Sequence, residues 1–182
     1  SNVDQLLVDK KYSFFNPKAG INFQNNKKNR FYISLARAFR EPTRSDFENN
    51  INIQPEELID YELGWNFTSE KFYFSSNLYY MKYKNQLVLT GSIDDVGTPI
   101  RDNSGESYRK GIELESAYVF SDKINISGNM SFSKNKNVDY VTNLNGQSVN
   151  LGDTDISFSP KLISSVQISY DPSPNFNISL YF

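Results

Sequence analysis

The sequence predicts an all-β fold, an antiparallel up-and-down meander of about eight strands. Apolar and polar residues alternate with period two through most of the chain, so successive side chains of a strand point to opposite faces. The links between these segments are alternately short and long, so every second link lies at the same end of the sheet. Helical periodicity is negligible, and one turn at Glu56–Ile59 is the most that we expect.

The alternation is clearest in residues 59–67, where the odd positions hold Ile, Tyr, Leu, Trp and Phe and the even positions hold Asp, Glu, Gly and Asn. Most segments are close to the roughly nine to eleven residues that a tilted strand needs to cross a bilayer. The expected strands are Ser13–Gln24, Arg30–Arg40, Glu57–Thr68, Lys71–Thr90, Glu106–Phe120, Lys123–Tyr140, Lys161–Asp171 and Asn175–Phe182.

Each expected strand is supported by an apolar row on one face. The first contains Pro17, which cannot donate to a ladder and is expected at a bulge or at the strand's rim. The fourth and sixth exceed a bilayer crossing, so they are expected to project beyond it. In order, the rows are Ala19, Ile21, Phe23; Phe31, Ile33, Leu35, Phe39; Ile59 to Phe67 at odd positions; Phe72, Phe74, Leu78, Tyr80; Ile112, Leu114, Tyr118, Phe120; Ile124, Ile126, Met130, Phe132; Leu162, Val166, Ile168, Tyr170; and Phe176, Ile178, Leu180, Phe182.

The lengths of the links indicate what kind of sheet this is. The long links are polar, and outer-membrane barrels combine short periplasmic turns with long extracellular loops. The pattern therefore predicts a segment of a transmembrane β-barrel. The short links are Asn25–Asn29, Ser69–Glu70, Ser121–Asp122 and Pro172–Pro174, and the long ones are Glu41–Glu56, Gly91–Gly105 and Val141–Pro160.

The composition excludes several classes of function. The 182 residues include no histidine and no cysteine, which removes Ser-His-Asp and Cys-His nucleophiles and zinc sites built on these side chains. The net charge of −2 does not favour nucleic acid as a partner. A run of about eighteen apolar residues, as a membrane helix needs, is missing. We therefore expect no catalytic residue, no metal ligand and no cofactor, and the protein is predicted not to be an enzyme.

Five short sequence words resemble the barrels of TonB-dependent outer-membrane receptors. They occur in that family's order and spacing over roughly residues 14 to 120, and the remainder fits by the rhythm of its strands. The words are Phe15–Gly20 (FNPKAG), Ala38–Thr43 (AFREPT), Pro55–Glu57 with Tyr61–Gly64 (PEE and YELG), Leu78–Tyr80 (LYY) and Lys110–Glu115 (KGIELE).

The resemblance implies a barrel of about twenty-two strands with a plugged lumen, of which residues 1–182 supply one part without the plug domain. It also implies location in the bacterial outer membrane and active uptake of a scarce nutrient: an iron chelate, haem, a cobalamin or a glycan. The implied partners are outer-membrane lipid, a small-molecule or metal-chelate ligand, and the energy-coupling protein TonB through the absent N-terminal region.

Three sets of side chains are candidates for roles in such a barrel. Arginines near the loop-facing strand ends are expected to form a basic rim that draws in anionic ligands, although loop ion pairs or contacts to lipid phosphates explain them too. Two glutamates on one strand are expected in the wet lumen wall, and five aromatics at the membrane interfaces. The sets are Arg37, Arg40, Arg44, Arg101 and Arg109; Glu113 and Glu115; and Trp65, Phe67, Phe72, Phe120 and Tyr170.

Other interpretations stay open at this point. The alternative function is a self-contained eight-stranded outer-membrane barrel that acts as an adhesin or structural anchor, since about eight strands can close. A barrel hydrolase would lack its histidine, and a soluble carbohydrate-binding β-sandwich would leave many aromatics exposed. Residues 102–106 and 153–155 carry enough oxygen for Ca²⁺, but turn chemistry explains them equally well.

Overall fold

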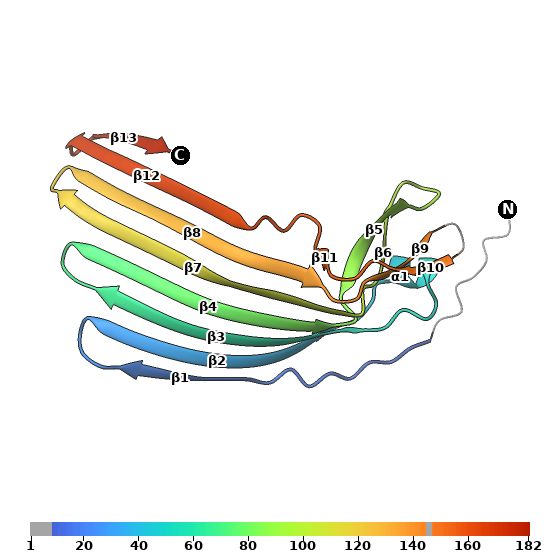
Figure 1. Cartoon of the computed structure of the whole chain (residues 1–182). Helices are drawn as coiled ribbons and strands as arrows, with labels where there is room; N and C mark the ends of the chain where they lie inside the picture. The colour runs from blue at the N-terminus through green and yellow to red at the C-terminus, as the bar shows by residue number, and fades with distance from the viewer. Residues whose placement is uncertain (1–8, 145–146) are drawn as a thin grey trace.

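The computed structural model describes residues 9–144 and 147–182, and most of them lie in one antiparallel sheet (Figure 1). Its long strands are β1 (Lys18–Gln24), β2 (Asn29–Arg40), β3 (Glu56–Thr68), β4 (Phe72–Lys84), β7 (Glu106–Ser121), β8 (Ile124–Asn137), β12 (Leu162–Ser173) and β13 (Phe176–Tyr181). They pair in that order, and the short β11 (Thr154–Asp155) pairs with β8. The predicted all-β meander is confirmed.

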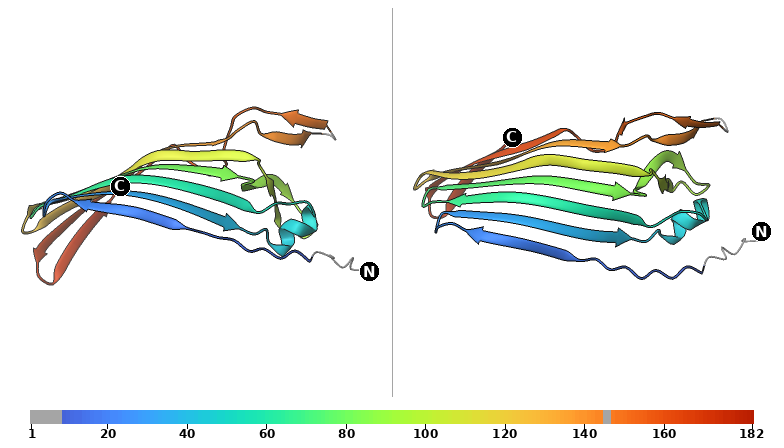
Figure 2. Two further views of the ribbon diagram at one scale, coloured as in Figure 1. Left: turned by 90° about the horizontal axis from the view of Figure 1, so that it is seen from below. Right: turned by 60° about the horizontal axis from the view of Figure 1, so that its bottom comes forward.

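The short links and the long links lie at opposite ends of the curved sheet (Figures 1 and 2). The long links carry further structure at the loop end. They contain helix α1 (Arg44–Asn49), the hairpin of β5 (Leu87–Ile93) with β6 (Pro99–Asn103), and the hairpin of β9 (Val141–Leu144) with β10 (Gln147–Asn150). No helix in residues 9–144 and 147–182 is long and apolar enough to cross a membrane.

The register aligns the apolar residues of neighbouring strands into rows across one face. One row crosses the six strands from β2 to β12 without a polar member, and Ile21 of β1, opposite Ile33, extends it. We call its six members the six-strand apolar row: Ile33, Leu63, Leu78, Ile112, Phe132 and Leu162. This row is not covered, because Leu63, Leu78 and Leu162 keep 50–53% of their surface exposed. Trp65, Ile126 and Leu180 are exposed as well. The apolar face of the sheet therefore has no protein packed on it among the described residues.

The expected single strand Lys71–Thr90 is wrong, because the chain breaks into β4 and β5. Asn85 lies between them with a φ of 55°, a left-handed conformation that asparagine tolerates and a continuous strand does not allow. β5 then pairs with β6 in a separate two-stranded sheet. The expected strand Lys123–Tyr140 likewise ends at Asn137, and Pro17 lies just outside β1, whose first residue is Lys18.

No helical turn forms at Glu56–Ile59, where the sequence allows one at most, since those residues begin β3. The helix lies earlier, in α1, and a capping box starts it. The backbone N–H and the hydroxyl of Thr43 both donate to the Asp46 carboxylate, at 2.8 Å each. Such a box satisfies orphan donors of the first helical turn.

Two inward-facing tyrosines lie across glycines of the neighbouring strand. Tyr32 is directly opposite Gly64, and Tyr79 is directly opposite Gly111. A methyl group at either glycine would overlap the tyrosine ring. Glycine at these two positions therefore lets the ring lie flat against the polar face of the sheet.

Candidate functional site

The loops at the long-link end pack into a small core of their own. Phe47 of α1, Ile53 and Leu87 of β5 are buried together, and Tyr12 packs against them. Ile53 is completely buried. We call Phe47, Ile53 and Leu87 the loop core, and it joins two of the three long links.

An ion pair fastens α1 to the β5–β6 hairpin. The Arg101 guanidinium donates to both carboxylate oxygens of Asp46, at 3.0 and 3.3 Å, and also to the Thr43 hydroxyl at 3.3 Å. Burial raises the pKa of Asp46, but the hydrogen bonds from Thr43 and the charge of Arg101 outweigh it and hold that pKa below its ordinary value. The carboxylate, 3% exposed, is therefore kept ionised and paired.

Hydrogen bonds between backbone groups and side chains connect the same two links. The Asn103 amide donates to the carbonyl oxygens of Gln54 and Asn85, at 3.0 and 2.8 Å, and accepts from the Gln54 N–H at 2.8 Å. The Leu87 N–H donates to the Glu56 carboxylate at 2.9 Å. Because these bonds cross between loops, the described part of this region is a folded unit.

The five predicted rim arginines all lie at the loop end, but the structure does not gather them into one cluster. Three of them have carboxylate partners. Arg37 is on the apolar face of β2, 2.8 Å from Glu57, and Arg44 pairs with Glu48 at 2.8 Å along α1. Arg101 is held by Asp46 in the contact described above. The charges of these three are therefore compensated inside the protein.

Arg40 and Arg109 lie on the polar face, and neither forms an ion pair within the described residues. Arg109 donates to the Ser159 hydroxyl at 3.2 Å, and its guanidinium lies 6.0 Å from the Tyr83 ring centre. It lines a cavity of about 370 Å³ between the β5 strand, the end of β8 and residues 151–158. This cavity offers a ligand the Arg109 cation, the Asp155 carboxylate, hydroxyl groups and apolar side chains.

Glu113 and Glu115 lie on the polar face of β7, whereas their neighbours Ile112 and Leu114 lie on the apolar face. The Asn77 amide donates to Glu113 at 3.3 Å. Both glutamates line a shallow hollow of about 370 Å³ together with Tyr32 and with polar residues of β8. Within the described residues, no group of three or more side chains of the His, Cys, Asp or Glu type is placed to hold a metal ion.

The predicted interface aromatics lie near the short-turn end of the apolar face. Trp65, Phe67 and Phe72 form a chain of ring contacts with centroid separations of 6.5 and 6.1 Å. Phe120 contacts Tyr118 at 6.4 Å. Tyr170 pairs across strands with Ile124 at the same end.

A second aromatic band lies near the loop end. Tyr61, Tyr80 and Tyr108 follow one another across β3, β4 and β7 with centroid separations of 6.3 Å. Tyr108 and Tyr118 are ten residues apart on β7. At about 3.3 Å per residue and a tilt of about 40°, the two bands are roughly 25 Å apart along a barrel axis, close to the height of the apolar band of outer-membrane barrels.

Comparison with known proteins decides the family. The family described as "TonB dependent receptor-like, beta-barrel" matches residues 2–182. The chain belongs to this family. Its members are transport receptors of the bacterial outer membrane rather than enzymes. The resemblance seen in the sequence words is thereby confirmed over the whole chain. No curated protein matches it in sequence.

Solved structures share the fold of this receptor barrel segment. The siderophore receptor PiuA from Acinetobacter baumannii is 20% identical, with a TM-score of 0.67 over 90% of this chain and 25% of its own. The siderophore receptor PirA from Pseudomonas aeruginosa is 14% identical, with a TM-score of 0.68 over 91% and 29%. The iron transporter FrpB from Neisseria meningitidis is 19% identical, with a TM-score of 0.62 over 90% and 25%. The chain thus spans under a third of each of these structures.

Proposed function

We propose that this chain is part of the barrel wall of an outer-membrane receptor that takes up an iron chelate by TonB-dependent transport. The observation that carries the proposal is the difference between the two faces of the sheet. One face exposes a six-strand apolar row that water would not favour, and the other carries Glu113, Glu115 and other polar side chains. A wall between hydrocarbon and a wet lumen needs this arrangement.

The proposal includes a division of labour along the polypeptide. Residues 1–182 form a segment of the wall, whereas the plug and the TonB-contacting region belong to other parts of the receptor. In support, β1 and β13 are the two edges of the described sheet and do not pair with each other. Unpaired edges of this length favour further strands on both sides over a self-contained eight-stranded barrel.

The ligand that fits the loop end best is an anionic iron chelate. Arg109 and Arg40 lie on the polar face at the loop end, and Arg109 lines the cavity between the loops. Guanidinium groups form strong, charge-assisted hydrogen bonds with anionic oxygens. Two structures of the same fold are described as siderophore receptors, which favours an iron chelate over haem, a cobalamin or a glycan.

The test is a titration of the complete receptor polypeptide in detergent with ferric tris-catecholate, haem and cobalamin. Binding is detected by the quenching of tryptophan fluorescence. Arg109→Ala should weaken binding of the tris-catecholate about tenfold or more, because a charge-assisted hydrogen bond contributes roughly 1.5–3 kcal/mol. The control is Arg44→Ala, which removes an 81% exposed cation from the same end and should leave the affinity unchanged. Binding of none of the three probes by the folded wild type would overturn the proposal.

A further inference from the structure

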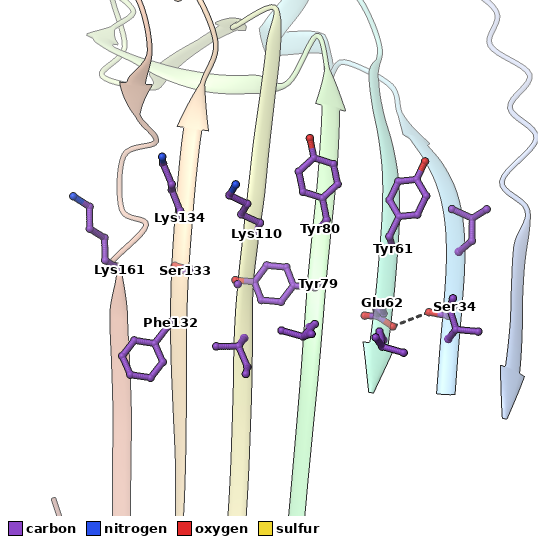
Figure 3. A pocket seen from close by; sticks show the side chains of 16 residues that line it. Ser34, Tyr61, Glu62, Tyr79, Tyr80, Lys110, Phe132, Ser133, Lys134 and Lys161 are labelled. Carbon is purple, nitrogen blue, oxygen red and sulfur yellow. Dashed lines mark hydrogen bonds between the residues drawn. The ribbon is translucent and has the colours of Figure 1, made fainter. Parts of the chain in front are cut away.

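The apolar face contains a groove that reaches the level of the second aromatic band (Figure 3). Its volume is about 850 Å³, and it crosses β2, β3, β4, β7 and β8. Five members of the six-strand apolar row, all but Leu162, form its floor, with Leu63, Leu78 and Ile112 at the centre. At its loop end the next row contains Leu35, Tyr61 and Tyr80 and then changes to lysine on β7 and β8.

Three lysines close the groove at this end. Lys110 of β7 is directly opposite Tyr80 on one side and Lys134 of β8 on the other. Lys161 comes next, because the Ser133 N–H donates to its carbonyl oxygen at 2.9 Å and so aligns it with β8. Figure 3 shows the three side chains side by side, all extended toward the loop end. We call Lys110, Lys134 and Lys161 the lysine trio.

The positive charge of the trio is only partly compensated by the protein itself, and an aromatic contact places the Lys110 ammonium 5.4 Å from the Tyr108 ring centre. Lys110 and Lys134 occupy directly opposed positions, where like charges are destabilising, and neither forms an ion pair within the described residues. Lys161 is 3.9 Å from Asp155, but that carboxylate is already held by Lys136 at 2.9 Å. Lys82 lies nearby and pairs with Glu106 at 3.4 Å. An external anion at the trio would relieve this repulsion.

The geometry points to a phosphate-bearing lipid as the occupant: its phosphate lies among the lysine trio and its acyl chains run down the groove over the six-strand apolar row. This inference rests on the proposed function, since it needs the apolar face to lie in a membrane. Lys110 and Lys134 lie in one row with Tyr61 and Tyr80, at the level where aromatic rings meet headgroups, whereas Lys161 is aligned with Ser133, one position closer to the apolar row. Long lysine side chains reach headgroup anions from such a position.

The continuity of the groove with the trio distinguishes a lipid from a soluble anion. On the apolar face, Ile112 of the groove floor lies one row from Lys110, which is opposite Lys134 of β8. A molecule bound at the ammonium groups therefore also contacts the apolar floor. A soluble phosphate gains the charge contact alone, whereas a lipid also removes apolar surface from water. The loop end is the outer end of such barrels, which places the lipid in the outer leaflet.

Native mass spectrometry of the complete receptor polypeptide tests the inference. The protein is equilibrated in detergent with equimolar phosphatidic acid and phosphatidylcholine, and the retained lipids are counted. The test variant replaces the trio (Lys110→Gln, Lys134→Gln, Lys161→Gln). The control replaces three exposed lysines at the short-turn end (Lys27→Gln, Lys71→Gln, Lys123→Gln), which gives the same change in net charge.

We expect wild type and control to retain phosphatidic acid in preference to phosphatidylcholine. In the trio variant the ratio of the two retained lipids should fall about tenfold or more. Each lysine near an anionic lipid surface adds roughly fivefold. Equal retention by the two variants, no preference in the wild type, or full competition by soluble glycerol phosphate would overturn the inference. The titration with ferric tris-catecholate, run on the same variants in lipid-free detergent, reports separately on the proposed uptake function.

Discussion

The sheet and the loop end differ in whether protein covers their apolar side chains. In the loop end, Phe47, Ile53 and Leu87 are buried against one another, as in a water-soluble domain. In the sheet, the largest apolar side chains stay exposed in rows, and the buried hydrophobic residues, which include Ile156, lie outside the eight long strands. The difference supports the proposal that water surrounds the loop end and that hydrocarbon surrounds the sheet's apolar face.

The comparison also separates two sources of stability. The loop end is stabilised by its small core, by the ion pair between Asp46 and Arg101, and by hydrogen bonds that cross between links. The sheet is stabilised by its ladders, and in the proposed function lipid covers its apolar face. Substitutions in the two regions should therefore respond to different features of the environment.

The largest effect is expected for Ile53→Ala. Ile53 is completely buried, so its truncation leaves a cavity in the loop core and should destabilise the loop fold by about 2–5 kcal/mol. Hydrogen exchange of the backbone amides in α1 and β5 is the measurement. The matched control is Ile51→Ala in the same link, because that side chain is 56% exposed and should cost little. Equal exchange in the two variants would mean that the loop core does not exist in solution.

A positive charge introduced on the apolar face should destabilise the barrel much more than one on the polar face. The expected effect is slightly smaller than that of Ile53→Ala. Leu114→Arg places a cation midway between the aromatic bands on the apolar face and should cost about 2–4 kcal/mol in a bilayer. Glu115→Arg, one residue further on the polar face, should cost far less. Urea unfolding of the complete receptor in phosphatidylcholine vesicles measures both. A larger cost for Glu115→Arg would reverse our assignment of the faces.

Loss of the Asp46 charge should weaken the loop end without affecting the sheet. Asp46→Asn keeps the shape of the side chain but leaves Arg101 without its anion, at a cost of about 1–3 kcal/mol. Protease cleavage within residues 41–55 should become faster, while the unfolding midpoint of the barrel stays constant. Arg44→Gln serves as the control, because its exposed pair with Glu48 along the helix contributes at most a few tenths of a kcal/mol.

Lowering the pH should also make proteolysis of the loop faster, but less so than Asp46→Asn does, because a protonated Asp46 can still accept hydrogen bonds from Thr43. Its pKa in the folded loop is below the ordinary 3.8, so the unfolded loop binds the proton more tightly. The carboxylate's contribution is complete above 3.8 and is lost as the pH falls through the lower, folded pKa. Proteolysis or exchange of the loop measured from pH 6 to pH 3 should follow this course, and Asp46→Asn should flatten it.

The period-two pattern was sufficient to predict the eight long strands of the sheet and their faces, although not all of their ends, because alternation is a local property of each strand. The predicted row of Ile112 and Leu114 lies on the apolar face, and Glu113 and Glu115 lie on the other. The break after β4 was missed because one left-handed residue, Asn85, ends an otherwise continuous alternation. The helix was missed although Thr43 and Asp46 have the spacing of a capping box, which was an available signal.

The candidate sites were harder to predict, because they depend on register between strands. Lys110 and Lys134 are 24 residues apart in the chain, and only the pairing of β7 with β8 brings them opposite each other. The rim arginines were placed at the correct end, but their carboxylate partners Glu57 and Asp46 could not be assigned without the fold. The binding roles of Arg40 and Arg109 stay predictions.

The most direct test of the lipid-facing assignment is a nitroxide scan of β7 in the complete receptor, reconstituted in phosphatidylcholine vesicles. Labels are placed singly at Ile112, Glu113, Leu114 and Glu115, and their collision rates with oxygen and with a water-soluble nickel chelate are compared. We predict alternation: oxygen reaches positions 112 and 114 preferentially, and the nickel chelate reaches 113 and 115. Equal access at all four positions, or the opposite alternation, would contradict a sheet whose apolar face contacts hydrocarbon.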